Sequence, residues 1–290
     1  MVGLSVAGVL VGLVPPLLLG VLVNALVERN DKREAALLAV LIALATLAEA
    51  GLYIASDGMY ARNAGHLYRN LRVAMFAGAL ARARRGEDNA GVASRFISDA
   101  ETVERATLSI LDTGAMLGVE FVSALVALAA LEPWTLPVVA PVLAVTWIVT
   151  RRMQAPAAAA GQRRQEELEA MTRSLDVELG HGDDAEAPNR FRIAAERVLG
   201  AEVRYGWLQA FNLQGSGGLA KVGPIAVVVA AAFAGVHHAG TLISIYLLAQ
   251  RTFWGFDGVV DLSLGTQSVR GSVARCLELV DAADSVPRAP

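Results

Sequence analysis

The sequence predicts an all-α integral membrane protein, and three observations lead to that fold class. Hydrophobic residues occupy 54% of the 290 positions. Charged residues occupy only 18%, and the mean hydropathy is +0.47, whereas a soluble domain of this length normally carries more charge. Apolar stretches of roughly 20 residues, the length that a membrane-spanning helix needs, recur along the whole chain and predict six such helices.

The first apolar stretch, 3–27, is predicted to be a transmembrane helix that Pro15-Pro16 kinks. No positively charged segment precedes it, and it is longer than the apolar region of a signal peptide. No small-residue cleavage site stands out either. These features favour a spanning helix over a cleaved leader.

The other five predicted spans follow in order. They are 35–55, 113–131, 134–150, 217–236 and 240–262. Only Glu132-Pro133 separates the third span from the fourth, and His237-His238-Ala239 separates the fifth from the sixth. Connections this short predict antiparallel helical hairpins.

Two long polar stretches, 56–112 and 151–216, each follow an even-numbered span and must therefore lie on the same side of the membrane. They contain eight and nine arginines, whereas the first loop on the opposite side has only Arg29, Lys32 and Arg33. Because cytoplasmic loops are enriched in basic residues, both stretches are predicted to be cytoplasmic. The expected location is the plasma membrane of a bacterial cell.

The polar stretches have helical periodicity. Apolar residues recur at three- and four-residue steps in 162–179, and charged residues occupy the other faces. The segment 60–81 repeats this pattern. The membrane helices are therefore expected to continue into the cytoplasm as long rods.

A family resemblance begins in the first of these stretches. The segment Gly91-Val92-Ala93-Ser94-Arg95-Phe96-Ile97-Ser98-Asp99-Ala100-Glu101-Thr102-Val103 resembles the G-x-x-x-S-R-x-x-x-D-x-x-x-V pattern of type I (exporter-type) ABC transporter membrane domains. Tyr68 and Leu71-Arg72 also match that family's upstream pattern. The resemblance implies the exporter type 1 transmembrane fold over 1–282, with 283–290 a tail or the start of a linker.

Weaker matches follow the family's order along the chain. Pro15-Pro16 to Leu26 resembles its first helix, with Asn24 where an acid is common. The segment 175–192 resembles its second cytoplasmic loop, 240–242 the start of helix six, and 273–281 the helix that closes the membrane domain.

The sequence also departs from the family. It contains no G-x-x-x-x-G-K-[ST] phosphate loop, so no ATPase activity and no bound cofactor are expected of this chain itself. By resemblance, no counterpart of the family's N-terminal elbow helix is expected before the first predicted span, and the sequence given ends about where the family's linker leads to the nucleotide-binding domain. That domain, with ATP and Mg²⁺, is expected on a separate polypeptide or in a longer native one.

By resemblance, two such subunits, identical or different, form a dimer whose cavity alternates between inward- and outward-facing states. Two regions, 88–100 and 181–192, are expected to couple the dimer to the ATPase, although both could be merely solvated polar loops. The residues assigned to coupling are Gly91, Ser94, Arg95, Asp99, Gly182, Asp183 and Asp184.

Polar residues inside the predicted spans are costly unless they pair or face a cavity. Arg251 is predicted to pair with Glu49 or Glu120; it could instead reach the membrane interface or pair with Asp257. Trp254 could stack on an aromatic cargo or anchor to lipid. The candidate cavity-lining residues are Asn24, Glu49, Glu120, Gln250, Arg251 and Trp254.

Three functions remain open. The chain could export a small molecule, lipid or peptide, import siderophores on the same fold, or act as an ATP-independent scaffold or regulatory protein. An intramembrane enzyme is disfavoured because no metal motif, Ser/His pair or aspartate dyad occurs in the spans. A net charge of −3 argues against nucleic acid as a partner, and with Cys276 alone no intrachain disulfide or cysteine metal cluster can form.

Overall fold

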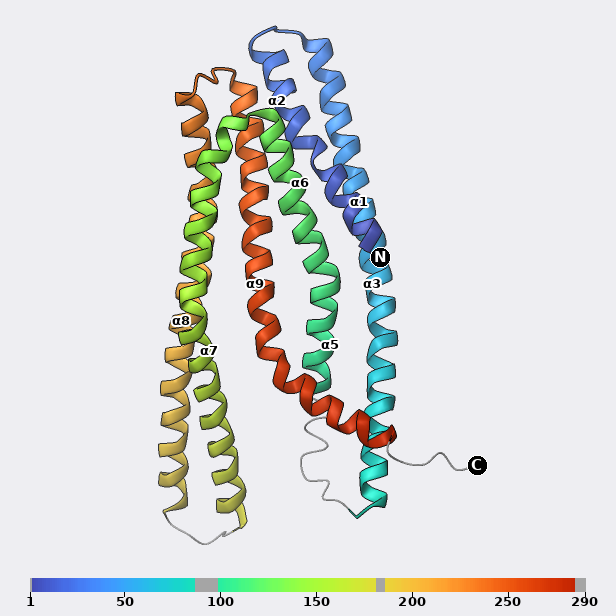
Figure 1. Cartoon of the computed structure of the whole chain (residues 1–290), viewed down its shortest axis with the longest axis vertical. Helices are drawn as coiled ribbons and strands as arrows, with labels where there is room; N and C mark the ends of the chain where they lie inside the picture. The colour runs from blue at the N-terminus through green and yellow to red at the C-terminus, as the bar shows by residue number, and fades with distance from the viewer. Residues whose placement is uncertain (1, 87–98, 181–185, 285–290) are drawn as a thin grey trace, which may run out of the picture. The chain divides into compact units, whose positions relative to one another are not determined.

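Every element of the described chain is helical, which confirms the all-α fold class (Figure 1). The computed structural model describes residues 2–86, 99–180 and 186–284. The elements are α1 (Val2–Gly12), α2 (Val14–Val27), α3 (Lys32–Arg84), α5 (Ala100–Leu108), the π-helical turn η2 (Ser109–Gly114), α6 (Ala115–Leu131), the 3₁₀ turn η3 (Pro133–Thr135), α7 (Leu136–Gly180), α8 (Ala187–Phe233) and α9 (Ala239–Asp284).

All six predicted spans are helical, and three segments of the described chain are long and apolar enough to cross a bilayer. These segments are Val2–Val27, Lys32–Arg84 and Pro133–Leu175. The third and fifth predicted spans correspond to shorter apolar helices, Ala115–Leu131 and Ala220–Phe233. The sixth lies in α9, where Gln250, Arg251 and two aspartates reduce its hydropathy. The membrane-protein class therefore stands, and the count of six spans stays a prediction.

The first span is broken, as its two prolines predict. Helix α1 ends at Gly12, and α2 begins at Val14 with proline in its first turn. The intervening Leu13 bonds through its amide to the carbonyl of Leu10 at 3.2 Å, a tighter turn than an α-helix makes. Proline is favoured at the start of a helix because its missing N–H has no partner there.

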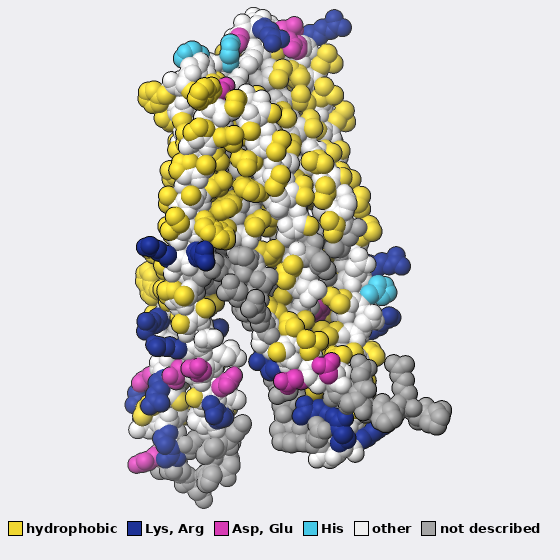
Figure 2. Space-filling view, viewed as in Figure 1, with side chains coloured by type: hydrophobic (Ala, Val, Ile, Leu, Met, Phe, Trp, Pro, Cys, Tyr) yellow, Lys and Arg dark blue, Asp and Glu magenta, His cyan; other side chains and the backbone are white. Residues whose placement is uncertain are grey.

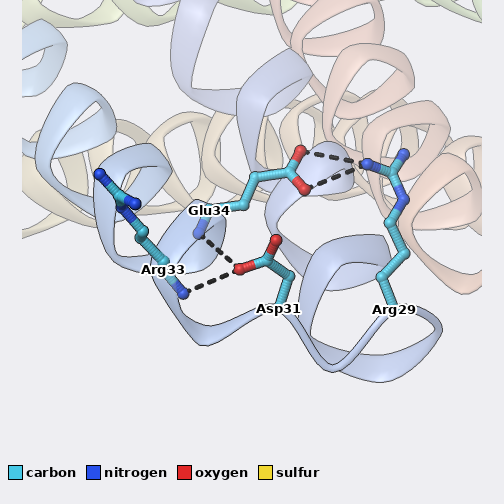
Figure 3. Close-up of polar contacts among 4 residues, drawn as sticks. All are labelled: Arg29, Asp31, Arg33 and Glu34. Carbon is cyan, nitrogen blue, oxygen red and sulfur yellow. Dashed lines mark hydrogen bonds and ion pairs between the residues drawn. The ribbon is translucent and has the colours of Figure 1, made fainter.

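Helix α3 begins at a side-chain cap in the α2–α3 turn (Figure 3). The carboxylate of Asp31 accepts hydrogen bonds from the backbone amides of Arg33 and Glu34, both at 3.0 Å. Arg29 in turn donates to both carboxylate oxygens of Glu34, at 3.1 and 3.2 Å. A cap of this kind satisfies amides that would otherwise have no partner at a helix start.

The chain divides into two compact units, 1–140 with 223–290, and 141–222. Both boundaries lie inside helices and beside prolines, Pro141 in α7 and Pro224 in α8. A proline inside a helix removes a backbone hydrogen bond and favours a bend.

In the first unit, α9 packs against α2, α3, α5 and α6 (Figure 1). Helices α2 and α9 approach each other so closely that a side chain added at Gly240 would collide with the carbonyl oxygen of Gly20. Ser244 of α9 also donates a hydrogen bond to the carbonyl of Pro16 at 2.8 Å. Near its C-terminal end, α9 forms a small core with α3 and α5 from Met75, Ala100, Cys276 and Leu279.

The surface of the first unit suits a lipid environment. Leu37, Leu44, Leu47 and Ile54 are large apolar side chains of α3 that remain exposed. On the face drawn in Figure 2, hydrophobic side chains cover the region of α1, α2 and the first half of α3, whereas charged side chains gather at the α2–α3 turn. Apolar exposure on this scale marks an interaction surface in a soluble protein and a lipid-facing surface in a membrane protein.

The second unit is an antiparallel hairpin of α7 from Pro141 onward and α8 as far as Val222. Arg164 of α7 forms an ion pair with Glu202 of α8 and lies over the ring of Tyr205, 5.4 Å from its centroid. The predicted rod at 162–179 lies within α7, and the one at 60–81 lies within α3, so both rods are confirmed as helices.

Candidate functional site

The candidate site is a charged triad in the first unit, formed by Glu49 of α3, Glu120 of α6 and Arg251 of α9. Arg251 Nη2 lies 3.3 Å from Glu49 Oε1, and Arg251 Nη1 lies 3.8 Å from Glu120 Oε1. The side chains are 16% (Glu49), 19% (Glu120) and 24% (Arg251) exposed, so the triad is mostly removed from solvent. The predicted pairing of Arg251 is thereby confirmed, with both carboxylates rather than one.

All three residues lie deep in the apolar part of their helices. Glu49 comes 17 residues after the start of α3, and Arg251 comes 12 residues after the start of α9. Glu120 lies 11 residues before the end of α6. At 1.5 Å per residue these separations correspond to about 26, 18 and 17 Å, whereas a bilayer's hydrocarbon core is about 30 Å thick.

Helix α1 closes one side of the triad through a glycine. A side chain at Gly12 would collide with Glu49 Oε1 and come within 2.7 Å of Arg251 Nη1. Gly12 itself is buried. The absence of a side chain here lets α1 approach the charged groups closely, so four helices meet at the triad.

The charges of the triad do not balance, because two carboxylates face one guanidinium. In a low-dielectric region the attraction between Arg251 and one carboxylate is strong, but the negative charge of the second carboxylate is then costly. Arg251 therefore links α3 and α6 through α9, and a movement that separates these helices must break at least one of its contacts. The unbalanced carboxylate also makes the site more favourable for a cationic group than for an anionic one.

The other candidate cavity-lining residues lie outside the triad. The side-chain oxygen of Asn24, near the end of α2, accepts a hydrogen bond from the backbone amide of Gly240 at 2.8 Å. It therefore supplies the first turn of α9 with an acceptor from another helix. Gln250 is half-buried and Trp254 is exposed; neither forms a hydrogen bond, ion pair or ring contact with a described residue.

Of the residues assigned to coupling, Asp99 is the one that the structure describes, and it is buried against α9. Its carboxylate accepts from Arg275 Nε and Nη2, both at 2.7 Å, and from Ser272 Oγ at 2.9 Å. Asp99 thus ties the first polar stretch, just before α5, to the last part of α9. Outside the described residues lie Gly91, Ser94, Arg95, Gly182, Asp183 and Asp184, together with most of the predicted tail at 283–290.

Sequence reasoning missed three residues that build these contacts, Gly12, Ser272 and Arg275. Arg275 belongs to the segment 273–281, which resembles the family's closing helix. That resemblance is the sequence feature that could have marked Arg275 as a contact residue. Gly12 had no signal beyond its place in an apolar helix. Among the described residues, no group of three or more histidine, cysteine, aspartate or glutamate side chains is placed to hold a metal ion.

No known family model matches the sequence, and no curated protein matches it closely.

Proposed function

We propose that this chain is the membrane-spanning subunit of an ATP-driven transporter of the exporter type. In this proposal two such subunits work as a pair, and a nucleotide-binding domain, separate or fused, hydrolyses ATP. The cargo is a small molecule, lipid or peptide. The resemblance of Gly91–Val103 and of the C-terminal segment 273–281 to exporter membrane domains supports the family.

The strongest support for the proposal is that a single helix, α9, contributes an arginine both to the triad and to the contact with the first polar stretch. Arg251 and Arg275 are 24 positions apart in α9, which corresponds to about 36 Å along a helix. Arg251 binds Glu49 and Glu120, and Arg275 binds Asp99. A displacement at Asp99 is thus connected by a continuous helix to the charged site.

The helix lengths support a function that transmits movement. Helices α3, α7, α8 and α9 contain 53, 45, 47 and 46 residues. At about 1.5 Å per residue, each is more than twice as long as the roughly 30 Å needed to cross a bilayer. Rods of this length carry a movement from outside the membrane to the bilayer interior.

The mechanism follows from a two-state equilibrium. ATP binding on the partner domains favours one arrangement of the coupling regions. The ion pair between Asp99 and Arg275 makes the position of α9 depend on that arrangement. Within the bilayer, Arg251 holds α3 and α6 to α9 in one arrangement and releases one of them in the other. Cargo with a positively charged group competes with Arg251 for the carboxylates.

The test is isolation of the tagged chain from its native membranes in mild detergent, followed by mass spectrometry and a vanadate-sensitive ATPase assay. The proposal expects a near-stoichiometric protein, or a longer native chain, that carries a phosphate loop. It also expects ATPase activity that falls in Asp99→Asn while the partner remains bound. Full recovery of the chain with no phosphate-loop partner and no ATP turnover would overturn the proposal.

A further inference from the structure

Three basic side chains lie where the α7–α8 hairpin of the second unit meets the ends of its apolar segments. Arg151 and Arg152 directly follow the predicted span 134–150 of α7, and Lys221 is the second residue of the apolar segment Ala220–Phe233 of α8. We infer that these three residues, called the basic collar, bind the anionic headgroups of membrane phospholipids. The inference goes beyond the proposed function, because it requires neither ATP nor a partner protein.

The side chains of the basic collar are available to an external anion. All three are exposed, and none forms a hydrogen bond or ion pair with another residue of the described chain. The arginines at the end of the hairpin farther from the apolar segments differ, because Arg190 pairs with Glu186 and Arg192 pairs with Glu196. A cation without an internal partner keeps its full attraction for an anion outside the chain.

The charges of the hairpin are separated along its length. The segments nearest the apolar spans, 151–165 and 203–222, contain six basic residues and no aspartate or glutamate. The segments farther from the spans, 166–180 and 186–202, contain eight acidic and four basic residues. On the face drawn in Figure 2, Lys and Arg side chains of the hairpin lie next to its hydrophobic cover, and Asp and Glu side chains appear farther along. The hairpin therefore presents positive charge to the bilayer and keeps negative charge away from it.

The position of the basic collar favours lipid headgroups over soluble anions. The collar lies on the side of the membrane predicted to be cytoplasmic, where anionic phospholipids give the leaflet a negative surface potential. Trp147 lies one helical turn before Arg151 on the same face of α7 and is 42% exposed. Tryptophan is enriched at the membrane interface, and a guanidinium binds phosphate well. The long apolar stem of Lys221 lets its ammonium group extend from the apolar segment towards the same headgroups.

The other unpaired basic residues near the spans lie farther from the bilayer. Arg163 comes 12 residues after Arg151, and Arg204 comes 16 residues before Ala220, which corresponds to about 18 and 24 Å along a helix. The interfacial zone is only about 5–8 Å deep, and salt screens charges over about 8 Å. Arg163 and Arg204 are exposed as well, so they separate the effect of position from the effect of charge.

The test compares how closely two lipids approach Trp147. The full chain, with Trp134, Trp207 and Trp254 replaced by phenylalanine, is reconstituted in phosphatidylcholine vesicles. Brominated phosphatidylglycerol or brominated phosphatidylcholine is added at equal mole fraction, because bromine quenches tryptophan fluorescence at short range. The inference expects the anionic lipid to be preferred beside Trp147 by about fivefold or more, the ratio that one basic residue near an anionic surface produces.

Removing the charge of the basic collar should remove this preference. Arg151→Gln combined with Arg152→Gln should lower the ratio severalfold, and Lys221→Gln alone should lower it in part. Arg151→Lys combined with Arg152→Lys keeps the charge and should keep the preference, which separates a loss of charge from a loss of folding. In about 1 M salt, where screening acts over about 3 Å, the preference of the starting protein should fall.

Two control pairs remove the same amount of charge elsewhere in the hairpin. Arg190→Gln with Arg192→Gln should leave the ratio unchanged, and Arg163→Gln with Arg204→Gln should change it little. A ratio near one in the starting protein, or an equal loss in either control pair, would overturn the inference.

An excess of glycerol phosphate at constant ionic strength distinguishes lipid from a soluble phosphate. The inference expects the preference to persist, and its loss would assign the basic collar to soluble phosphates instead. The vesicles contain neither ATP nor an ATPase, so failure of this inference leaves the proposed function standing. Absence of a phosphate-loop partner, in turn, would leave the lipid preference unchanged.

Discussion

Asp99 and Arg275 are 176 positions apart in the chain and meet in an ion pair with two hydrogen bonds of 2.7 Å. Ser272 adds a third hydrogen bond to the same carboxylate. Bidentate pairing with a guanidinium fixes orientation as well as distance. The pair therefore sets where the last part of α9 lies against α5 and α3.

Replacing Asp99 with asparagine should lower the free energy of unfolding of the first unit. The variant loses the ionic contact to Arg275 and leaves Ser272 with a weaker acceptor. Because Arg275 is half exposed, the expected loss is about 1–2 kcal/mol, less than for a fully buried pair. Thermal unfolding followed by the helical circular dichroism signal measures it. Asp281→Asn, at an exposed carboxylate of the same helix, is the matched control, and an equal loss there would contradict the prediction.

Cys276 should react slowly with alkylating reagents at neutral pH. It is buried between α3, α5 and α9, and burial raises the pKa of its thiol. The charge of Asp99 raises that pKa further, and the charge of Arg275 opposes it. Less thiolate is therefore present than for an ordinary cysteine. Asp99→Asn removes the nearby negative charge and loosens the packing, so the alkylation rate should increase.

The sign of the accompanying pH effect follows from the raised pKa. The folded state favours the neutral thiol, so its contribution to stability is complete below the pKa of the unfolded thiol. It is lost as the pH rises towards the higher pKa of the folded state. Alkylation rates measured against pH should thus show a midpoint above the ordinary value of about 8.5. Ala274→Cys in a Cys276→Ala background is the exposed control, and an identical pH profile in both would contradict the prediction.

Removing Arg251 should destabilise the protein more than removing the whole triad. Arg251→Met leaves Glu49 and Glu120 facing each other without a counterion, at an expected cost of about 3 kcal/mol. Adding Glu49→Gln and Glu120→Gln removes both charges, so the triple variant should regain much of that loss. Chemical unfolding in detergent measures both variants. A triple variant less stable than Arg251→Met would show that the triad does not determine stability in this way.

The positions of the helices and the pairing of Arg251 were predictable from sequence for related reasons. Helical periodicity and apolar length are local properties, so most of α3 and α7 follows from nearby residues, whereas α9 was predicted only over 240–262 and extends to Asp284. Arg251 lies in an apolar segment that offers few charged partners. Glu49 and Glu120 are the acidic residues of the other predicted spans. The number of spanning helices was less predictable, because polar residues in α9 reduce the hydropathy of a segment that is nonetheless helical.

The contacts of Asp99 and Gly12 were not predictable in the same way. Asp99 lies in a polar stretch with many basic residues elsewhere in the chain, and no local pattern selects Arg275 among them. Gly12 looks like any other small residue of an apolar helix until the depth of Glu49 and Arg251 is known. Both contacts depend on how helices distant in sequence cross, which single-sequence patterns do not record.

Two glycines of α3 should respond in opposite directions to the same substitution. Alanine is more favourable than glycine inside a helix by about 1 kcal/mol, so Gly65→Ala, which meets no atom within 4 Å, should be neutral or slightly stabilising. At Gly78 the added methyl group collides with the backbone carbonyl of Leu279 in α9. Backbone atoms cannot rotate away as a side chain does, so Gly78→Ala must push α9 from α3 and disturb the Met75–Leu279 core.

The expected result for Gly78→Ala is a loss of about 1–3 kcal/mol, the range for overpacking a well-packed contact. The accompanying signature is faster alkylation of Cys276, because the same displacement opens its surroundings. The unfolding free energies and Cys276 alkylation rates of the two glycine variants are compared under identical conditions. If Gly78→Ala is as stable as Gly65→Ala and leaves the alkylation rate unchanged, the close contact between α3 and the end of α9 does not hold the fold together.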